Sequence, residues 1–309
     1  MRNAKNELLQ FLAGVVMLTV GLFIFSQKVV VYSSFMSGFS MGGMRITSGL
    51  IVIPLIAGIV WMFVSGASFP SKIMTALVTL DHCELDEEIE YSYHATHSIE
   101  YGSSSIARTE GEILTVEESL YALMLASANE CANALAEHIA GSVEEFAVLM
   151  NEKAKELGCV NTNFTNANGL HDENHYTCTY DMALITKAAL ENEDFRRISS
   201  EDYYTLRATN KNDEELLIQN HHYMISTYKS SKYLDETVFS GKTGYTTVAL
   251  NTLVTCGRRN DMDIIVVTMR TKSTGEKGVP LFTDTAALLD YANNFQKLNI
   301  SDLCGRKRL

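Results

Sequence analysis

The sequence predicts an α+β fold in which helices pack on an antiparallel sheet, preceded by two transmembrane helices. Three observations predict it: two long uncharged apolar stretches near the N-terminus, apolar residues at helical spacing through the middle, and strand-like runs near the end. A run of helices followed by a run of strands is typical of an α+β domain.

The two apolar stretches, residues 8–26 and 46–71, carry no charged side chain. Each is about as long as the roughly 20 residues that cross a bilayer core. We therefore expect transmembrane helices at about residues 8–26 and 47–65, inside a membrane segment of residues 1–66. Two basic residues precede the first stretch and two lie in the connecting loop, so the positive-inside rule does not decide the orientation.

The middle of the chain carries the helical signals. Apolar spacing predicts a helix from Lys72, and the acidic, then alternating residues 84–93 predict a short surface strand. Residues 115–141 begin with a capping box, because Glu118 follows Thr115 by three positions. Their apolar spacing predicts two helices with a break near Ser127. Two further helices are expected at residues 142–157, where Gly158 is the natural stop, and at residues 180–190.

Strands follow beyond residue 200. Residues 252–259 and 261–270 are rich in β-branched side chains and are separated by a turn around Asn260. Residues 284–295 are expected to close the domain with a helix. The resulting layout is a membrane segment, a soluble domain of residues 67–298 and a short basic tail of residues 299–309.

The composition excludes several functional classes. The 309 residues contain 37 acidic and 25 basic side chains, a net charge of −12 that argues against binding to nucleic acid. Six cysteines are scattered without a CxxC pair or a His-rich partner spacing, so the sequence predicts no zinc site.

Three short clusters combine residue types that carry chemistry. The first, Lys242-Thr243-Gly244, leads into the strand region. A strand edge with an ammonium, a hydroxyl and a glycine backbone is suited to hold a substrate carboxylate, and we expect Lys242 to face solvent there. A phosphate-binding loop is the alternative, but the GxxxxGK pattern is absent.

The second cluster is Ser127-Ala128-Asn129, at the expected helix break. Serine and asparagine disfavour a helix interior, so an ordinary helix cap is the alternative interpretation. The third is Lys72, at the start of an apolar helix. Burial there would lower its pKa and let it act as a base near neutral pH. The alternative is a lysine that flanks a membrane span and snorkels to the interface.

Taken together, a serine before Lys72, then Ser127-x-Asn129, then Lys242-Thr243-Gly244 occur in the order found in penicillin-recognising serine acyl-transferases. The intervening segments resemble the D-alanyl-D-alanine carboxypeptidase family of low-molecular-weight penicillin-binding proteins over about residues 67–298. They include KIMTAL, GEILTVEESLYALMLASANECANALAEHIAGS, FAVLMNEKAKELG, NANGLHDENHYTCTYDMALI and GKTGYTT. The resemblance implies a penicillin-binding-protein/β-lactamase-like transpeptidase domain.

The resemblance also implies a reaction. A serine would attack the terminal D-Ala-D-Ala bond of a peptidoglycan stem peptide, and the acyl-enzyme would then be hydrolysed. Lys72 is implied as the base, Ser127 as the proton relay to the leaving amine, and Asn129 as the group that holds the substrate amide. No metal or organic cofactor is implied.

Substrate binding is implied for the strand motif. Lys242 and Thr243 would bind the terminal carboxylate, Gly244 would let the peptide approach closely, and the backbone N–H of Tyr245 would supply half of the oxyanion hole. The implied partners are stem peptides ending in D-Ala-D-Ala and β-lactam antibiotics.

The position of the nucleophile departs from the family pattern. The family has its serine three residues before the lysine, where this chain has Phe69. Ser68 lies four residues before Lys72, about 40° away around a helix, whereas Ser71 lies about 100° away. Pro70 disfavours helical geometry at Phe69. Ser68 is therefore the candidate nucleophile.

Two hypotheses follow. In the first, the chain is a serine-type D-Ala-D-Ala carboxypeptidase of a bacterial cell membrane, with membrane lipid as a partner and its soluble domain outside the cell. The alternative is a catalytically impaired membrane protein that binds cell-wall peptide or penicillin, because the Ser-x-x-Lys spacing is broken. A β-lactamase relative is a third interpretation, which shares the motifs but not the intervening segments.

Overall fold

The computed structural model describes residues 39–41, 44–46, 71–228, 230–272 and 280–291. The chain divides into two units, Met1–Ser65 and Gly66–Leu309. In the first unit, strands β1 (Phe39–Met41) and β2 (Met44–Ile46) form an antiparallel pair.

The two expected transmembrane helices, at about residues 8–26 and 47–65, lie outside the described residues. None of the helices that the structure does describe is both long enough and apolar enough to cross a membrane.

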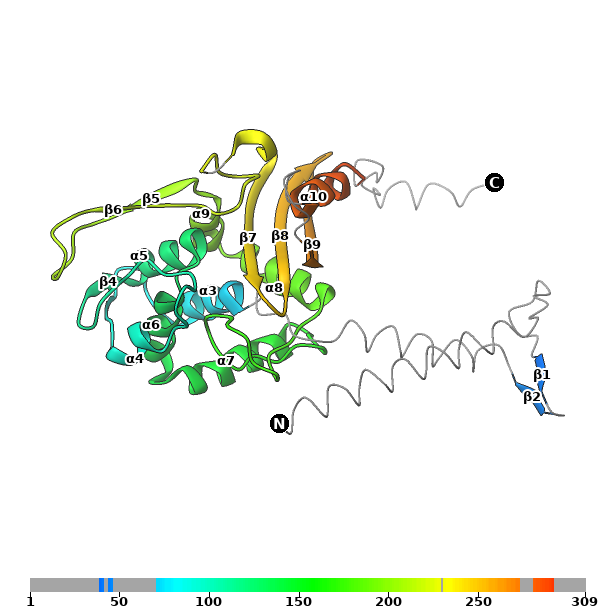
Figure 1. The fold of residues 1–309 in the computed structure, drawn as a ribbon, viewed down its shortest axis with the longest axis horizontal. Helices are drawn as coiled ribbons and strands as arrows, with labels where there is room; N and C mark the ends of the chain where they lie inside the picture. Colours follow the sequence, from blue (N-terminus) through cyan, green and yellow to red (C-terminus); the bar gives the residue numbers. More distant parts are fainter. Residues whose placement is uncertain (1–38, 42–43, 47–70, 229, 273–279, 292–309) are drawn as a thin grey trace, which may run out of the picture. The chain divides into compact units, whose positions relative to one another are not determined.

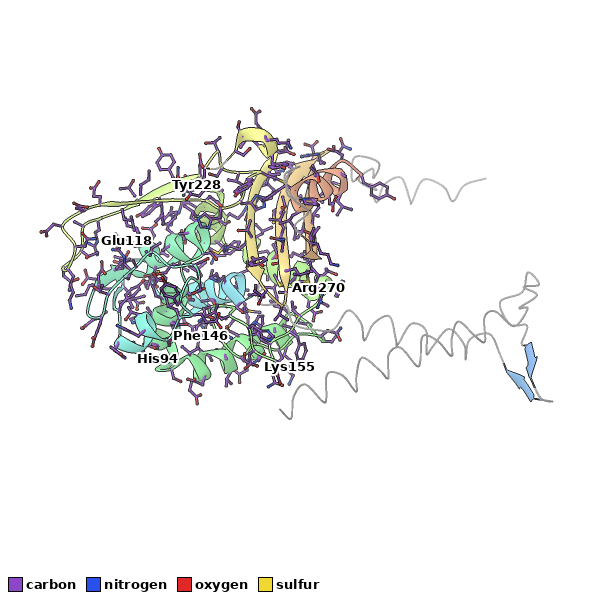
Figure 2. The ribbon with its side chains drawn as sticks, in the orientation of Figure 1. His94, Glu118, Phe146, Lys155, Tyr228 and Arg270 are labelled. Carbon is purple, nitrogen blue, oxygen red and sulfur yellow. The ribbon has the colours of Figure 1, made fainter. Side chains whose placement is uncertain are left out.

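The second unit contains a helical part and a sheet part (Figure 1). The helical part surrounds α3 (Ser71–His82). This helix packs against α6 (Asn129–Ala140), α7 (Val143–Glu156), α8 (Thr179–Glu191) and α9 (Glu193–Ser200). Phe146 of α7 is completely buried, and Figure 2 shows it among these helices. The helices of this part are α3 (Ser71–His82), α4 (Tyr93–His97), α5 (Val116–Tyr121), the π-helix η1 (Ala122–Ala126), α6 (Asn129–Ala140) and α7 (Val143–Glu156). Strands β3 (Glu88–Glu90) and β4 (Ile113–Thr115) form a small antiparallel pair beside them.

Local signals in the sequence account for the helix ends. The capping box is confirmed, because the Thr115 side chain accepts from the backbone N–H of Glu118 and the Glu118 carboxylate accepts from the backbone N–H of Thr115. Ser142 caps α7, and Gly158, with φ of 80°, stands just beyond its end. The expected break near Ser127 is confirmed between η1 and α6.

The sheet part is an antiparallel sheet in the order β7-β8-β9. Its strands are β7 (Val238–Thr246), β8 (Leu250–Arg259) and β9 (Met262–Thr271). Asn260 and Asp261 form the turn between β8 and β9 with φ of 50° and 58°. Two consecutive residues with positive φ match the right-handed twist of a hairpin. The antiparallel sheet and the turn confirm the expectation from the sequence.

Side chains alternate between the two faces of this sheet. Val254 and Cys256 of β8 belong to the main core, with α3, α8 (Thr179–Glu191) and α9 (Glu193–Ser200). Leu253 and Val266 point to the other face, where they pack with Leu281, Phe282 and Leu289 of α10 (Pro280–Tyr291). The sheet is therefore covered on both faces, with α8 and α9 on one and α10 on the other (Figure 1).

Several elements differ from the sequence expectation. Helix α10 begins at Pro280 rather than at Asp284, because proline is favoured in the first turn of a helix. Helix α9 and the hairpin of β5 (Tyr203–Leu206) and β6 (Leu216–Gln219) have no counterpart among the expected elements. The 3₁₀ turn η2 (Ser231–Tyr233) lies between that hairpin and β7.

Candidate active site

Lys72 lies in the first turn of α3, with its side chain directed at two hydrogen-bond acceptors. Its ammonium donates to Asn129 Oδ1 at 2.7 Å and to the carbonyl oxygen of Asn168 at 2.6 Å. Burial lowers the pKa of Lys72 to about 8, and the nearby Glu130 carboxylate opposes that shift. A substantial fraction of the amine is therefore neutral near physiological pH, and a neutral amine can accept a proton.

The carbonyl that binds Lys72 belongs to a tight loop. Thr75, one turn after Lys72, donates to the carbonyl of Ala167 at 2.7 Å, so two side chains of α3 hold successive residues of this loop. Gly169 takes φ of 80°, and its N–H donates to Asn166 Oδ1 at 2.7 Å. No role of Asn168 was predicted from the sequence, although its segment NANGL carries the asparagine and glycine pattern of a tight turn.

Ser127 and Asn129 reach the same place from the helix break. Ser127 takes the left-handed conformation, with φ of 62°, at the end of the π-helix η1. Asn129 begins α6, and its N–H donates to the carbonyl of Ser104 at 2.9 Å. Left-handed serine and π-helical turns are uncommon and cluster at functional sites.

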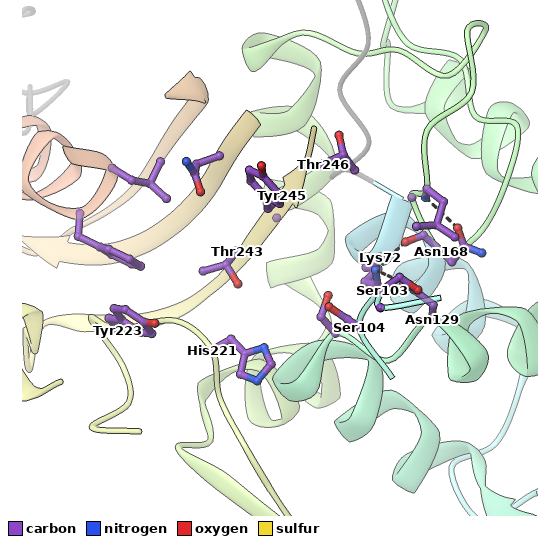
Figure 3. A pocket seen from close by; sticks show the side chains of 18 residues that line it. Lys72, Ser103, Ser104, Asn129, Asn168, His221, Tyr223, Thr243, Tyr245 and Thr246 are labelled. Carbon is purple, nitrogen blue, oxygen red and sulfur yellow. Dashed lines mark hydrogen bonds between the residues drawn. The ribbon is translucent and has the colours of Figure 1, made fainter. Parts of the chain in front are cut away.

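A pocket of about 350 Å³ lies between the helical part and strand β7. Figure 3 shows Lys72 and Asn129 on the helical side and Thr243 and Tyr245 on the strand side. Ser127 and Gly244 also line it. Six of the eight site residues expected from the sequence are thus brought together. Further lining residues that the sequence analysis missed are Ser103, Ser104, Asn168, His221, Tyr223 and Phe282.

Lys242 corrects one expectation. It is 1% exposed rather than solvent-facing, and its ammonium donates to the carbonyl of Thr243 at 3.0 Å. Directly opposite residues of an antiparallel pair share a face, and the partner of Lys242 on β8 is Val254, a residue of the main core. Burial, and then repulsion from the charge of Lys72, hold the pKa of Lys242 well below its usual range.

A glycine lets β7 lie close to a buried histidine. A Cβ at Gly241 would come within 2.5 Å of the carbonyl oxygen of Val254 and 2.6 Å of His222. The His222 ring hydrogen-bonds Thr255 Oγ1 at 2.9 Å, and burial lowers its pKa to about 3. Neutral His222 and Gly241, which has no side chain, therefore allow close packing around β7, the strand on which Thr243 lines the pocket.

Of the two serines nearest to Lys72, only Ser71 is described; Ser68 lies outside the described residues. Ser71 is buried, with its hydroxyl 2.7 Å from His175 Nε2. The N–H of Thr165 donates to Nδ1 of the same ring at 3.2 Å, so Nε2 carries the proton and donates to Ser71. Burial lowers the pKa of His175 to about 4, which keeps the ring neutral. Ser71 thus anchors the start of α3, and its expected position off the face of Lys72 is confirmed.

The pocket combines groups that suit acyl transfer. A lysine with a lowered pKa stands beside hydroxyl and amide side chains, opposite the edge strand β7. The described residues that line it include one histidine, His221, and no cysteine or carboxylate, so they offer no set of metal ligands.

Comparisons with known proteins agree with this geometry. A family model described as "D-alanyl-D-alanine carboxypeptidase" matches residues 64–273. The D-alanyl-D-alanine carboxypeptidase DacF of Bacillus subtilis is 34% identical over 229 residues, which cover 72% of this chain and 54% of that protein. DacB2 of Mycobacterium tuberculosis, with the same description, is 28% identical over 220 residues, covering 71% and 70%. The chain thus spans about half the length of DacF.

Solved structures show the same fold. A D-alanyl-D-alanine carboxypeptidase from Mycobacterium tuberculosis H37Rv superposes with a TM-score of 0.66 at 26% identity, over 75% of this chain and 83% of that one. A point mutant of the Streptomyces K15 DD-transpeptidase gives a TM-score of 0.66 at 25% identity, over 75% and 89%. The expected α+β transpeptidase-like domain is confirmed.

Proposed function

The chain belongs to the D-alanyl-D-alanine carboxypeptidase family, and we propose that it is a serine-type D-Ala-D-Ala carboxypeptidase of peptidoglycan stem peptides. One observation carries the proposal. The buried amine of Lys72 lies at 2.7 Å from Asn129 in a pocket that Ser127 and Thr243 also line. These residue types, held around one cavity, suit an acyl-enzyme mechanism.

In the proposed reaction, Ser68 is the nucleophile. Neutral Lys72 takes the proton of the Ser68 hydroxyl as its oxygen bonds to the carbonyl carbon of the penultimate D-alanine. The bond to the terminal D-alanine breaks, and Ser127 relays the proton from Lys72 to the leaving amine, which makes Lys72 neutral again. Asn129 holds the substrate amide. Water then hydrolyses the ester and restores the Ser68 hydroxyl.

The strand motif would bind the substrate. Thr243 and Lys242 would receive the terminal carboxylate, whose negative charge favours the protonated form of Lys242. Gly244 would leave room for the peptide backbone, and the N–H of Tyr245 would stabilise the oxyanion. β-Lactam antibiotics, which present a carboxylate and a reactive amide, would occupy the same pocket.

The membrane assignment is part of the proposal. Residues 1–66 would form the two transmembrane helices, residues 67–298 the catalytic domain and residues 299–309 a basic tail. The support is the absence of charge over residues 8–26 and 47–65 and their membrane-spanning length. The domain would lie outside a bacterial cell, where its peptidoglycan substrate is.

Labelling with a fluorescent penicillin tests the function. The full chain in a membrane preparation would be saturated with the label, digested, and analysed by mass spectrometry for the modified peptide. We expect one covalent adduct on Ser68, with release of D-alanine from a synthetic peptide. An adduct on Ser103, Ser104 or Ser127 would keep the activity and reject Ser68 as the nucleophile. Neither adduct nor D-alanine release would contradict the enzyme and favour binding without turnover.

A further inference from the structure

Three potential metal ligands meet at the end of the helical part away from the pocket. They are Cys83, just beyond the end of α3; Glu87, before β3; and His138, in the last turn of α6. Their sulfur, carboxylate oxygen and ring nitrogen atoms all lie within 4.8 Å of one another. We propose that Cys83, Glu87 and His138 form a binding site for a divalent transition-metal ion such as Zn²⁺.

The donor set fits zinc. Thiolate, imidazole and carboxylate are its usual protein ligands, and in a tetrahedral site the donor atoms lie roughly 3.5 Å apart. His138 Nε2 is already 3.0 Å from Glu87 Oε2. The remaining adjustment is a small rotation of side chains. Water would fill the fourth position, because the Glu87 and His138 side chains are 40% and 29% exposed.

The surroundings hold these ligands in place. The N–H of Glu84 donates to Glu87 Oε1 at 2.6 Å, which orients the carboxylate and leaves Oε2 toward His138. The N–H of Cys83 donates to the carbonyl of Thr79 at 3.0 Å and so extends the hydrogen-bond ladder of α3.

Burial raises the pKa of Cys83 to about 11, with a further contribution from Glu87. Metal binding therefore releases the thiol proton to solvent.

The backbone also favours a cation here. Helices α3 and α6 meet at their first turns, where Lys72 contacts Asn129, and again at their last turns, where Cys83 lies close to His138. They are therefore parallel, and both C-terminal ends point at the cluster. The partial negative charge at a helix C-terminus stabilises a nearby cation. The ion would join the far ends of the two helices that carry Lys72 and Asn129.

Cobalt binding tests the site without any measurement of activity. Co²⁺ added to the metal-free full chain in detergent should give a thiolate-to-cobalt charge-transfer band at one ion per chain, and Zn²⁺ should abolish it. Cys83→Ser should remove the band. Glu87→Gln and His138→Gln should each weaken binding by about tenfold or more.

Two matched controls sharpen the test. Cys159→Ser removes another half-buried thiol. His94→Gln removes a histidine of α4 that makes the same kind of contact, 2.6 Å from Glu137 but without a cysteine, at the edge of the helical part (Figure 2). Both should bind Co²⁺ like the parent. No band in the parent, or a band that survives Cys83→Ser, would overturn the proposal. Circular dichroism would establish that each variant is folded. If Cys83→Ser does not fold, Glu87→Gln, which changes an exposed side chain, still tests the site.

Discussion

Lys72 illustrates how the surroundings of one side chain decide its chemistry. Enclosure in the helical part removes water from the ammonium, while Asn129 Oδ1 and the Asn168 carbonyl hold it by hydrogen bonds. Burial is the largest influence on the pKa of Lys72 and lowers it to about 8. The amine is mostly protonated below that pH and mostly neutral above it. Only the neutral form can act as a base.

The first prediction follows from the lowered pKa of Lys72. Penicillin acylation should rise with pH and level off above about 8, falling about tenfold per pH unit well below this value, because only neutral Lys72 accepts the serine proton. Stopped-flow labelling between about pH 6 and pH 9 measures it. Lys72→Arg, which stays protonated throughout, is the control and should be inactive. A flat profile in the parent would exclude Lys72 as the base.

Lys242 supports a second prediction, and because this lysine is buried, the substitution must preserve the volume of its side chain. Lys242→Met keeps the length of the buried stem, so it removes the charge without a large cavity. Penicillin acylation should fall about tenfold to a hundredfold, which corresponds to a lost charge-assisted hydrogen bond of roughly 1.5–3 kcal/mol. The thermal midpoint should stay equal or rise. Lys187→Met, at an exposed position on α8, is the matched control. Unchanged acylation in Lys242→Met would reject carboxylate binding by this residue.

A third prediction concerns Pro70. Its deletion places Ser68 three residues before Lys72 and removes a residue type that disfavours helical geometry at the position before it. Ser68 could then enter the first turn of α3, where the positive end of the helix favours a developing oxyanion. Acylation should therefore be faster than in the parent. Pro70→Ala keeps the four-residue spacing but removes the proline, so it separates the effect of spacing from the effect of proline on the backbone. If the parent acylates as fast as the deletion, the extra residue is no defect.

At the scale of elements, the sequence predicted what local chemistry determines. Caps and turns at Thr115, Ser127, Gly158 and Asn260 depend on a few consecutive residues, and all four were located correctly. The burial of Lys242 could not be predicted, because it depends on pairing with Val254 on another strand. The pocket role of Asn168 and the cluster around Cys83 likewise arise between segments distant in sequence. Hairpin β5–β6 was missed because its strands have four residues each and little alternation.

Strand β7 gives the fourth prediction. Gly241→Ala should destabilise the domain by about 1–3 kcal/mol or more, because its Cβ would meet the Val254 carbonyl, which cannot move away within the sheet. Gly257→Ala on β8 is the matched control, since its nearest neighbour is the flexible end of Leu289 at 3.3 Å. Urea unfolding compares the two. Equal midpoints would contradict the close approach of Gly241 to the Val254 carbonyl.

At the scale of the molecule, the proposed reaction and the proposed membrane segment constrain each other. The proposed carboxypeptidase acts on peptidoglycan, which lies outside the cytoplasm. Two spans, if both are inserted, return the chain to the side on which it began, so the side of Met1 decides the side of the domain. The charges around the spans are balanced and do not oppose an outer location.

The last prediction is therefore that both ends of the chain lie outside the cell. Alkaline phosphatase, which becomes active outside the cytoplasm, should be active when fused after Leu309 and inactive when inserted in the loop after Ser34. Green fluorescent protein, which fluoresces only when it folds inside, should give the reverse pattern. The two reporters control each other, because loss of both signals reports degradation rather than topology. Fluorescence from the fusion after Leu309 would put the pocket in the cytoplasm, where it has no cross-linked wall to act on, and the proposed carboxypeptidase function would fail with it.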